Sequence, residues 1–130
     1  MNAIGATCIL LGGKDDARYL DSIASKRAIR VIRDLTLQEF AGVIRELDLL
    51  ITSDTLALHL AIAQGVPSVS YYSPTSAAEI NTFGRGGKVS SLAEDYCSYR
   101  PDADNSTITA LRLFPEAQAL LDVHANSQQR

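Results

Sequence analysis

Short apolar runs recur along the chain and are separated by amphipathic or polar segments. Most of these runs are continuously apolar, which is typical of strands buried on both faces of a parallel sheet. Five of them are predicted to be strands: residues 6–11, 28–33, 48–52, 66–72 and 89–92. Alternation of such strands with helices predicts an α/β fold, a three-layer αβα sandwich around a Rossmann-like, mainly parallel sheet. The expected strand order is 2-1-3-4-5, with residues 6–11 beside residues 48–52.

Three amphipathic or apolar segments between these strands are predicted to be helices, at residues 15–25, 36–47 and 53–64. The second begins at a capping box, in which Thr36 and Glu39 each satisfy an amide of the first turn. The third ends at Gly65, a residue suited to the left-handed conformation that closes a helix. Because this third helix is apolar almost all round, we expect it to be buried.

The last third of the chain is more polar. Residues 84–88 are predicted to form a glycine-rich loop, and residues 93–106 to be irregular. Pro115 suits the first position of a closing helix that ends near Val123. Residues 124–130 are expected to form a frayed tail.

Composition indicates one ordinary globular domain, spanning residues 1–130. Hydrophobic residues make up 46% and charged residues 21% of the chain. Twelve Lys and Arg against fifteen Asp and Glu give a formal net charge of −3. This balance argues against nucleic acid or an anionic membrane as a partner, because both attract a basic surface. Cys8 lies in an apolar run and is expected to be a small buried hydrophobe.

The sequence carries no recognisable targeting or membrane segment. Residues 1–7 lack both a basic start and a long apolar stretch. The longest nearly apolar run, residues 56–63, is far shorter than the roughly 20 residues that a membrane-spanning helix needs. We therefore expect a cytoplasmic, reducing location and no integral membrane segment.

The turn after the third predicted strand is the first candidate binding site. The amides of Thr55, Leu56 and Ala57 stand at the start of a helix, where free N–H groups and the helix dipole favour a diphosphate. The alternative is that Ser53 or Asp54 merely caps the helix, as these residue types usually do.

Two other glycine-containing turns are weaker candidates. In the turn Gly12-Gly13-Lys14-Asp15-Asp16, an acid has the chemistry to bind ribose hydroxyls, or simply to stabilise a helix start. The spacing matches neither a dinucleotide-binding glycine motif nor a P-loop. The basic loop at residues 84–88 has the composition to close over phosphates, or to lie solvated on the surface.

His59 lies four residues after Thr55, on the same helical face. The chain has only two histidines, His59 and His124, and their spacing forms no metal motif and no nucleophile–base constellation. We therefore expect no metal ion, no cofactor and no catalytic residue that the sequence alone identifies.

Taken together, residues 34–67 resemble the signature of the heptosyltransferases, glycosyltransferase family 9. That signature is an amphipathic helix, an apolar strand, Asp-Ser/Thr-Gly-x-x-His-x-Ala and then Gly-x-Pro. The matching positions are Asp54, Thr55, His59, Ala61, Gly65 and Pro67. Residues 72–75 resemble the family's Gly-Pro-Thr turn, and residues 12–13 its Gly-Gly turn. The resemblance covers about residues 6–123.

The resemblance implies the carboxy-terminal, donor-binding half of a GT-B glycosyltransferase, a fold with two Rossmann-like halves. It implies that Thr55 and the amides of Leu56 and Ala57 face the donor diphosphate, while Asp54 and His59 shape the turn. The remaining implied nucleotide-sugar contacts come from Gly12, Gly13, Asp15 or Asp16 at the ribose, Leu35 near the base, and Thr75. Two positions depart from the family: Leu56 and Ser73 each stand where the family has glycine.

The implied function is binding of a nucleotide-sugar, an ADP-heptose-like donor, in lipopolysaccharide or related glycan synthesis. In the family, the acceptor site and its general base lie in the amino-terminal half. We therefore expect the chain to be incomplete for catalysis by itself, with an amino-terminal acceptor-binding half or another copy of the chain as partner. One alternative is a non-catalytic or degenerate Rossmann-like module that serves assembly or regulation. Another is a flavodoxin-like or receiver-type domain, for which Asp15, Asp16 and Asp54 would form the acidic cluster.

Overall fold

The structure is a computed structural model, and it describes residues 5–129. The fold is α/β, with parallel strands and four α-helices. The chain divides into two compact units at Phe40–Ala41, unit 1 up to Phe40 and unit 2 from Ala41 onward. Each unit has its own parallel sheet, and each is described by itself below.

Unit 1 contains a two-stranded sheet and one complete α-helix. Its elements are β1 (Ile9–Leu11), the 3-10 helix η1 (Lys14–Asp16), α1 (Ala17–Lys26) and β2 (Arg30–Ile32). The strands β1 and β2 are parallel, with Ile9 opposite Arg30 and Leu11 opposite Ile32. Leu20 of α1 is buried, while Ala17, Ile23 and Ala24 on the same face are half-buried, as their spacing predicts.

Unit 2 is built on a three-stranded parallel sheet in the order β3-β4-β5. The strands are β3 (Leu50–Ser53), β4 (Ser68–Tyr72) and β5 (Gly86–Ser90). Ser53 of β3 lies opposite Tyr71, and Tyr72 of β4 lies opposite Ser90. The three strands therefore end side by side at one edge of the sheet.

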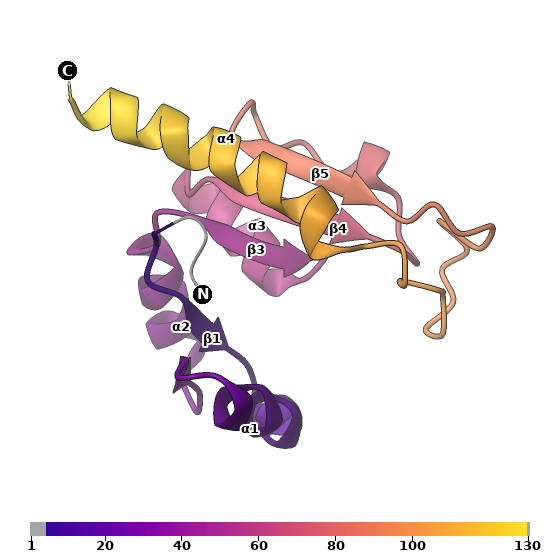
Figure 1. Ribbon diagram of the computed structural model, residues 1–130, viewed down its shortest axis with the longest axis horizontal. Coiled ribbons are helices and arrows are strands. Elements are labelled where there is room, and N and C mark those ends of the chain that lie inside the picture. Colours follow the sequence, from indigo (N-terminus) through magenta and orange to yellow (C-terminus); the bar gives the residue numbers. More distant parts are fainter. Residues whose placement is uncertain (1–4, 130) are drawn as a thin grey trace. The chain divides into compact units, whose positions relative to one another are not determined.

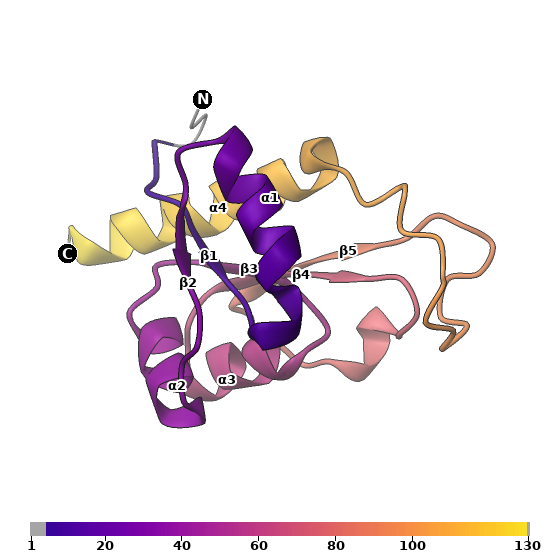
Figure 2. The same cartoon turned by 90° about the horizontal axis from the view of Figure 1, so that it is seen from below.

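Helices cover both faces of the unit 2 sheet. α3 (Leu56–Gln64) packs against β3 and β4, and α4 (Ala110–Gln128) packs against β4 and β5 on the opposite face (Figures 1 and 2). α2 (Leu37–Arg45) crosses the boundary between the units, and the 3-10 helix η2 (Ala77–Glu79) follows β4. None of the helices in the described chain is long and apolar enough to cross a bilayer.

The core of unit 2 lies between these layers. Strand β4 is its centre, since Ser68, Val69, Ser70 and Tyr72 are all buried. The other buried apolar side chains of this unit are Ile44, Leu50, Leu58, Ala61, Val66, Val89 and Ala117. Two predicted helix signals are confirmed here and in α2. Thr36 and Glu39 form the reciprocal capping box, and Gly65 closes α3 at φ +71°.

The single five-stranded sheet predicted from the sequence is not what the structure shows. It has one sheet of two strands and one of three. Within each sheet, the strands that pair (β1 with β2, β3 with β4, and β4 with β5) are ones that the order 2-1-3-4-5 also pairs. The first two strands are only three residues long, and their side chains are half-buried or exposed. Strands this short bury little apolar surface. The expectation of a fully buried first strand at residues 6–11 is therefore wrong. Cys8, expected inside, is exposed.

The glycine-rich segment at residues 84–88 is not a loop throughout, because β5 begins at Gly86. A β-carbon on Gly87 would lie 2.9 Å from Cβ of Glu116, and one on Gly86 would lie 2.6 Å from Cβ of Thr82. These glycines therefore allow neighbouring segments to approach a strand closely. The sequence pattern suggested a turn because glycine is common both in turns and at strand positions that another segment approaches closely.

Two further expectations need correction at the helices. Pro115 lies inside α4, not at its first position, and the helix begins five residues earlier. α4 also continues to Gln128, through the region expected to fray beyond His124. α3 is not buried all round: Leu58 and Ala61 are buried, but Leu56 is 56% exposed and His59 is also exposed.

Candidate functional site

The β3–α3 turn contains the first set of predicted site residues. Ser53 ends β3, and Thr55 is the N-cap residue of α3, with extended backbone at φ −142° and ψ 174°. The Thr55 hydroxyl lies 3.0 Å from the Thr52 hydroxyl and donates to the Ser53 carbonyl at 3.3 Å. Within the described chain, no side chain makes a capping hydrogen bond to the start of α3.

The first amides of α3 are consequently the open part of this turn. The Thr55 carbonyl accepts from the N–H groups of Leu58 and His59, at 3.1 and 3.3 Å. The N–H groups of Leu56 and Ala57 precede the first intrahelical bonds, so they point outward with the positive end of the helix dipole. The exposed side chain of Leu56 stands beside them.

Asp54 and His59 lie close together across the first turn of α3. His59 Nε2 lies 3.6 Å from Asp54 Oδ1, and the side chains are 59% and 20% exposed. Asp54 therefore interacts with a side chain one turn along the helix and does not cap the helix start. The predicted role of both residues in shaping a donor-binding turn stays a prediction.

The turn after β1 holds the second set, and it is closed by its own side chains. Asp16 Oδ2 accepts a hydrogen bond from the Gly13 N–H at 3.1 Å, while the Asp16 N–H donates to the Gly13 carbonyl at 3.2 Å. A β-carbon on Gly12 would lie 2.3 Å from Cδ1 of Leu20. Gly12 and Asp16 thus have structural roles within unit 1, and Asp15 is exposed.

The two remaining predicted residues lie outside these turns. Leu35 is half-buried and follows Asp34, whose backbone is left-handed at φ +61°. Thr75 is half-buried between β4 and η2, at the same edge of the sheet as the β3–α3 turn. Unit 2 therefore contains Asp54, Thr55, Leu56, Ala57, His59 and Thr75. Unit 1 contains Gly12, Gly13, Asp15, Asp16 and Leu35.

The third candidate, the basic segment at residues 84–88, does not present a free lysine. Lys88 Nζ donates to the carbonyls of Ala77 and Ile80, the former at 2.7 Å. Lys88 therefore fastens η2 to β5 and is not available to close over a phosphate. Arg85 is exposed and lies near Gly65, at the carboxyl end of α3, where a positive charge is favourable.

A polar segment that the sequence did not connect with this turn lies at the same sheet edge. The β5–α4 segment, residues 91–109, follows the end of β5 and connects it to α4 (Figure 1). The Ser73 and Ser91 hydroxyls both donate to the Asp104 carbonyl, each at 2.9 Å. Cys97 N–H donates to the Ser73 carbonyl at 2.9 Å. Polar irregular composition indicated a loop here but gave no sign of where the loop is attached.

Two tyrosines were also missed at this edge. The Tyr72 hydroxyl lies 2.8 Å from the Ser70 hydroxyl, inside the core. Burial raises the pKa of Tyr72, and the negative charge of Asp54 adds to this rise. Tyr96 OH accepts from the Ala77 N–H at 3.0 Å. The alternation of Ser70 and Tyr72 along β4 was a usable signal for the first contact, whereas no local pattern indicates the second.

The arrangement at the β3–α3 turn is suited to holding a negatively charged group. Backbone N–H groups at a helix start are fixed donors, and they can stabilise a diphosphate, including one that leaves during group transfer. No cluster of three or more His, Cys, Asp or Glu side chains in residues 5–129 has a geometry that could hold a metal ion.

Comparison with known proteins identifies the family. The family model of glycosyltransferase family 9 (heptosyltransferase) matches residues 1–107. No curated protein matches the chain, and no solved structure does. The matched region includes β1 to β5 and every predicted site residue. The chain therefore belongs to glycosyltransferase family 9, the heptosyltransferase family.

Proposed function

We propose that this chain binds a nucleotide-sugar through the β3–α3 turn, as the donor-binding part of a glycosyltransferase. The observation that carries the proposal is the open start of α3. Thr55 leaves the first amides of the helix uncapped, within the region that matches the family. The donor we favour is ADP-heptose-like, which corresponds to lipopolysaccharide or related glycan synthesis in a GT-B enzyme.

The chemistry of this turn suits the leaving-group side of glycosyl transfer. Transfer breaks the bond between the anomeric carbon and the diphosphate oxygen, and the departing diphosphate gains negative charge. In this proposal the Leu56 and Ala57 amides donate hydrogen bonds to it, and the Thr55 hydroxyl does so by exchanging the Ser53 carbonyl for a phosphate oxygen. Transfer also needs a base for the acceptor hydroxyl. We assign that role to no residue of this chain, so the proposal is donor binding without complete catalysis.

The predicted contacts of unit 1 remain part of this proposal. A carboxylate of Asp15 or Asp16 would accept from ribose hydroxyls, and Leu35 would lie near the base. Asp15 is the better candidate of the two acids, because Asp16 already accepts the Gly13 N–H.

One observation favours a second function, a non-catalytic module with an eroded donor site. The exposed Leu56 side chain stands next to the amides that a phosphate must approach. The family match supports the glycosyltransferase assignment over the receiver-type alternative.

Titration of the wild-type chain with ADP, GDP, UDP and their sugars, followed by thermal shift and calorimetry, tests donor binding. Leu56→Gly distinguishes the two functions. Glycine near the helix start should lower the free energy of unfolding by up to about 1 kcal/mol. It should also tighten nucleotide binding, since it frees the approach to the backbone.

Thr55→Val is the matched binding variant, because it keeps the side-chain shape and removes the hydroxyl. We expect it to weaken nucleotide binding by about 1 kcal/mol, the worth of one hydrogen bond. If the wild type binds no nucleotide and Leu56→Gly binds none either, the donor-binding proposal is wrong and the non-catalytic function stands.

A further inference from the structure

The end of the unit 2 sheet brings together segments that are far apart in sequence. Ser53 pairs with Tyr71, and Tyr72 pairs with Ser90. Neighbouring strands lie about 4.8 Å apart. The turns that follow these residues, at 54–55, 73–75 and 91–92, therefore begin at one sheet edge. The attachment points of the β5–α4 segment are thus next to the proposed diphosphate-binding turn.

Two buried serines hold this segment through one carbonyl. Ser73 and Ser91 are 5% and 4% exposed, and both hydroxyls donate to the carbonyl of Asp104 at 2.9 Å. Ser91 also lies 3.3 Å from the Thr107 hydroxyl, which accepts from the Leu92 N–H at 2.8 Å. Buried hydroxyls without partners would be costly, so these bonds fix the segment where it lies.

The segment also forms hydrogen bonds with the backbone carbonyls of the turn after β4. Cys97 N–H donates to the Ser73 carbonyl, and Tyr99 N–H donates to the Pro74 carbonyl at 2.8 Å. The Tyr99 hydroxyl donates to Glu79 Oε1 at 2.6 Å, and this bond raises the pKa of Tyr99. The carbonyls of Ser73 and Pro74 are therefore bound by the protein itself, and residues 97–99 form a boundary beside Thr75.

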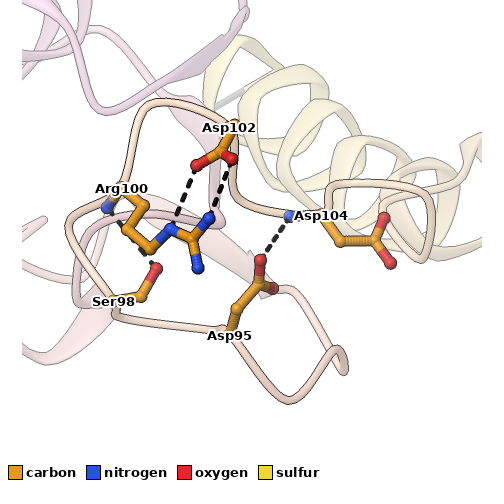
Figure 3. A network of polar contacts seen from close by, with 5 residues as sticks. All are labelled: Asp95, Ser98, Arg100, Asp102 and Asp104. Atoms are coloured by element: carbon orange, nitrogen blue, oxygen red, sulfur yellow. Dashed lines mark hydrogen bonds and ion pairs between the residues drawn. The ribbon is translucent and has the colours of Figure 1, made fainter.

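Contacts within the segment keep its shape (Figure 3). Arg100 binds Asp102 through two hydrogen bonds, from Nε at 3.1 Å and Nη2 at 2.9 Å. Asp95 Oδ2 accepts from the Asp104 N–H at 2.9 Å, next to the carbonyl that the serines share. The Asp104 carbonyl thus attaches the segment to the two serines, and the bonds made by Arg100 and Asp95 hold the rest of the segment in shape.

We propose that Ser73 and Ser91 are positioning residues for the nucleotide-sugar site, because they hold the β5–α4 segment as a wall that contacts the sugar part of the donor. This inference rests on the proposed function. The diphosphate lies at the β3–α3 turn, and the wall stands on the β4 side of that turn. The serines act through the segment and do not themselves touch the ligand.

The test uses Ser73→Ala and Ser91→Ala in the full chain, with Ser98→Ala as the matched control. Ser98 lies in the same segment, but its hydroxyl is exposed and accepts only a long bond from the Arg100 N–H at 3.4 Å. Hydrogen exchange of peptides spanning residues 93–107 reports the attachment of the segment. Calorimetric titration with ADP and with ADP-glucose reports binding, and Ser91→Thr keeps the hydroxyl as a rescue variant.

We expect faster exchange in both alanine variants and at least a roughly fivefold loss of affinity for ADP-glucose, with ADP affinity changed by less than about twofold. Ser98→Ala and Ser91→Thr should behave like the wild type. Unchanged exchange, or equal weakening of both ligands, overturns the inference. A wild type that binds ADP and ADP-glucose equally well also overturns it while leaving the proposed function intact. A wild type that binds neither overturns both.

Discussion

The turns after β1 and after β3 both lead from a parallel strand into a helix, and both carry an acidic residue. After β1, Asp16 accepts the Gly13 N–H and closes the turn with its own carboxylate. After β3, Asp54 pairs with His59 instead, and the Thr55 hydroxyl is directed at Thr52 and the Ser53 carbonyl. The turn after β1 is therefore closed across itself by a side chain, while the turn after β3 is not, although neither Asp16 nor Thr55 makes a side-chain cap bond to the α-helix that it precedes. An acid in a strand-to-helix turn is therefore weak evidence for a ligand, because its carboxylate can be bound within the protein, as that of Asp16 is.

The largest difference in stability between variants of these turns is expected at Gly12. Gly12→Ala places a β-carbon 2.3 Å from Cδ1 of buried Leu20, so Leu20 must move and unit 1 loses about 2 kcal/mol. Gly13→Ala is the matched control, because its β-carbon would meet only Asp16 Oδ2 at 3.7 Å. Hydrogen exchange of residues 9–26 measures the difference. Equal effects of the two variants would show that α1 does not pack closely on Gly12.

A smaller difference in stability is expected between variants of Asp16 and Thr55. Asp16→Ala removes the acceptor of the Gly13 N–H and should lower the local stability of unit 1 by about 1 kcal/mol. Thr55→Val should cost less than about 0.5 kcal/mol, since the Thr55 hydroxyl caps no helical amide. Denaturant unfolding combined with hydrogen exchange compares them. A larger loss in Thr55→Val than in Asp16→Ala would contradict the contrast between the two turns.

The smallest effect is expected at Asp54. Asp54→Asn keeps an oxygen that can accept from His59, and the contact involves an exposed histidine, so stability should change by less than about 0.5 kcal/mol. The midpoint of chemical denaturation measures this change. His59→Gln is the companion variant. A loss above about 1 kcal/mol in either variant would mean that this pair, and not the backbone, holds the β3–α3 turn.

Local signals were enough to predict much of the fold. The capping box of Thr36 and Glu39 and the left-handed Gly65 depend on neighbours in sequence, and both are present. The β3–α3 turn was found for the same reason, since a strand end followed by a polar triplet predicts a helix start. The resemblance to glycosyltransferase family 9 rested on this region, and the family assignment is confirmed.

The errors occur where distant residues decide the structure. α4 begins before Pro115 partly because Arg112 donates to the carbonyls of Thr107 and Ser90, both at 2.7 Å. Gly87 lies in β5, where the absence of a side chain allows Glu116 of α4 to approach the strand closely. Neither contact follows from the order of residues around the proline or the glycine. The attachment of residues 91–109 to the sheet was missed for the same reason.

The binding of the Lys88 ammonium to the carbonyls of Ala77 and Ile80 has a consequence for chemical modification. The chain has three lysines, and Lys14 and Lys26 are exposed on unit 1. An acylating reagent attacks the free, deprotonated amine, so the hydrogen-bonded and partly covered Lys88 should be acylated last. Brief acetylation would therefore modify Lys14 and Lys26 of unit 1 and leave Lys88 of unit 2 unmodified. Only after η2 detaches from β5 would Lys88 become as reactive as the other two.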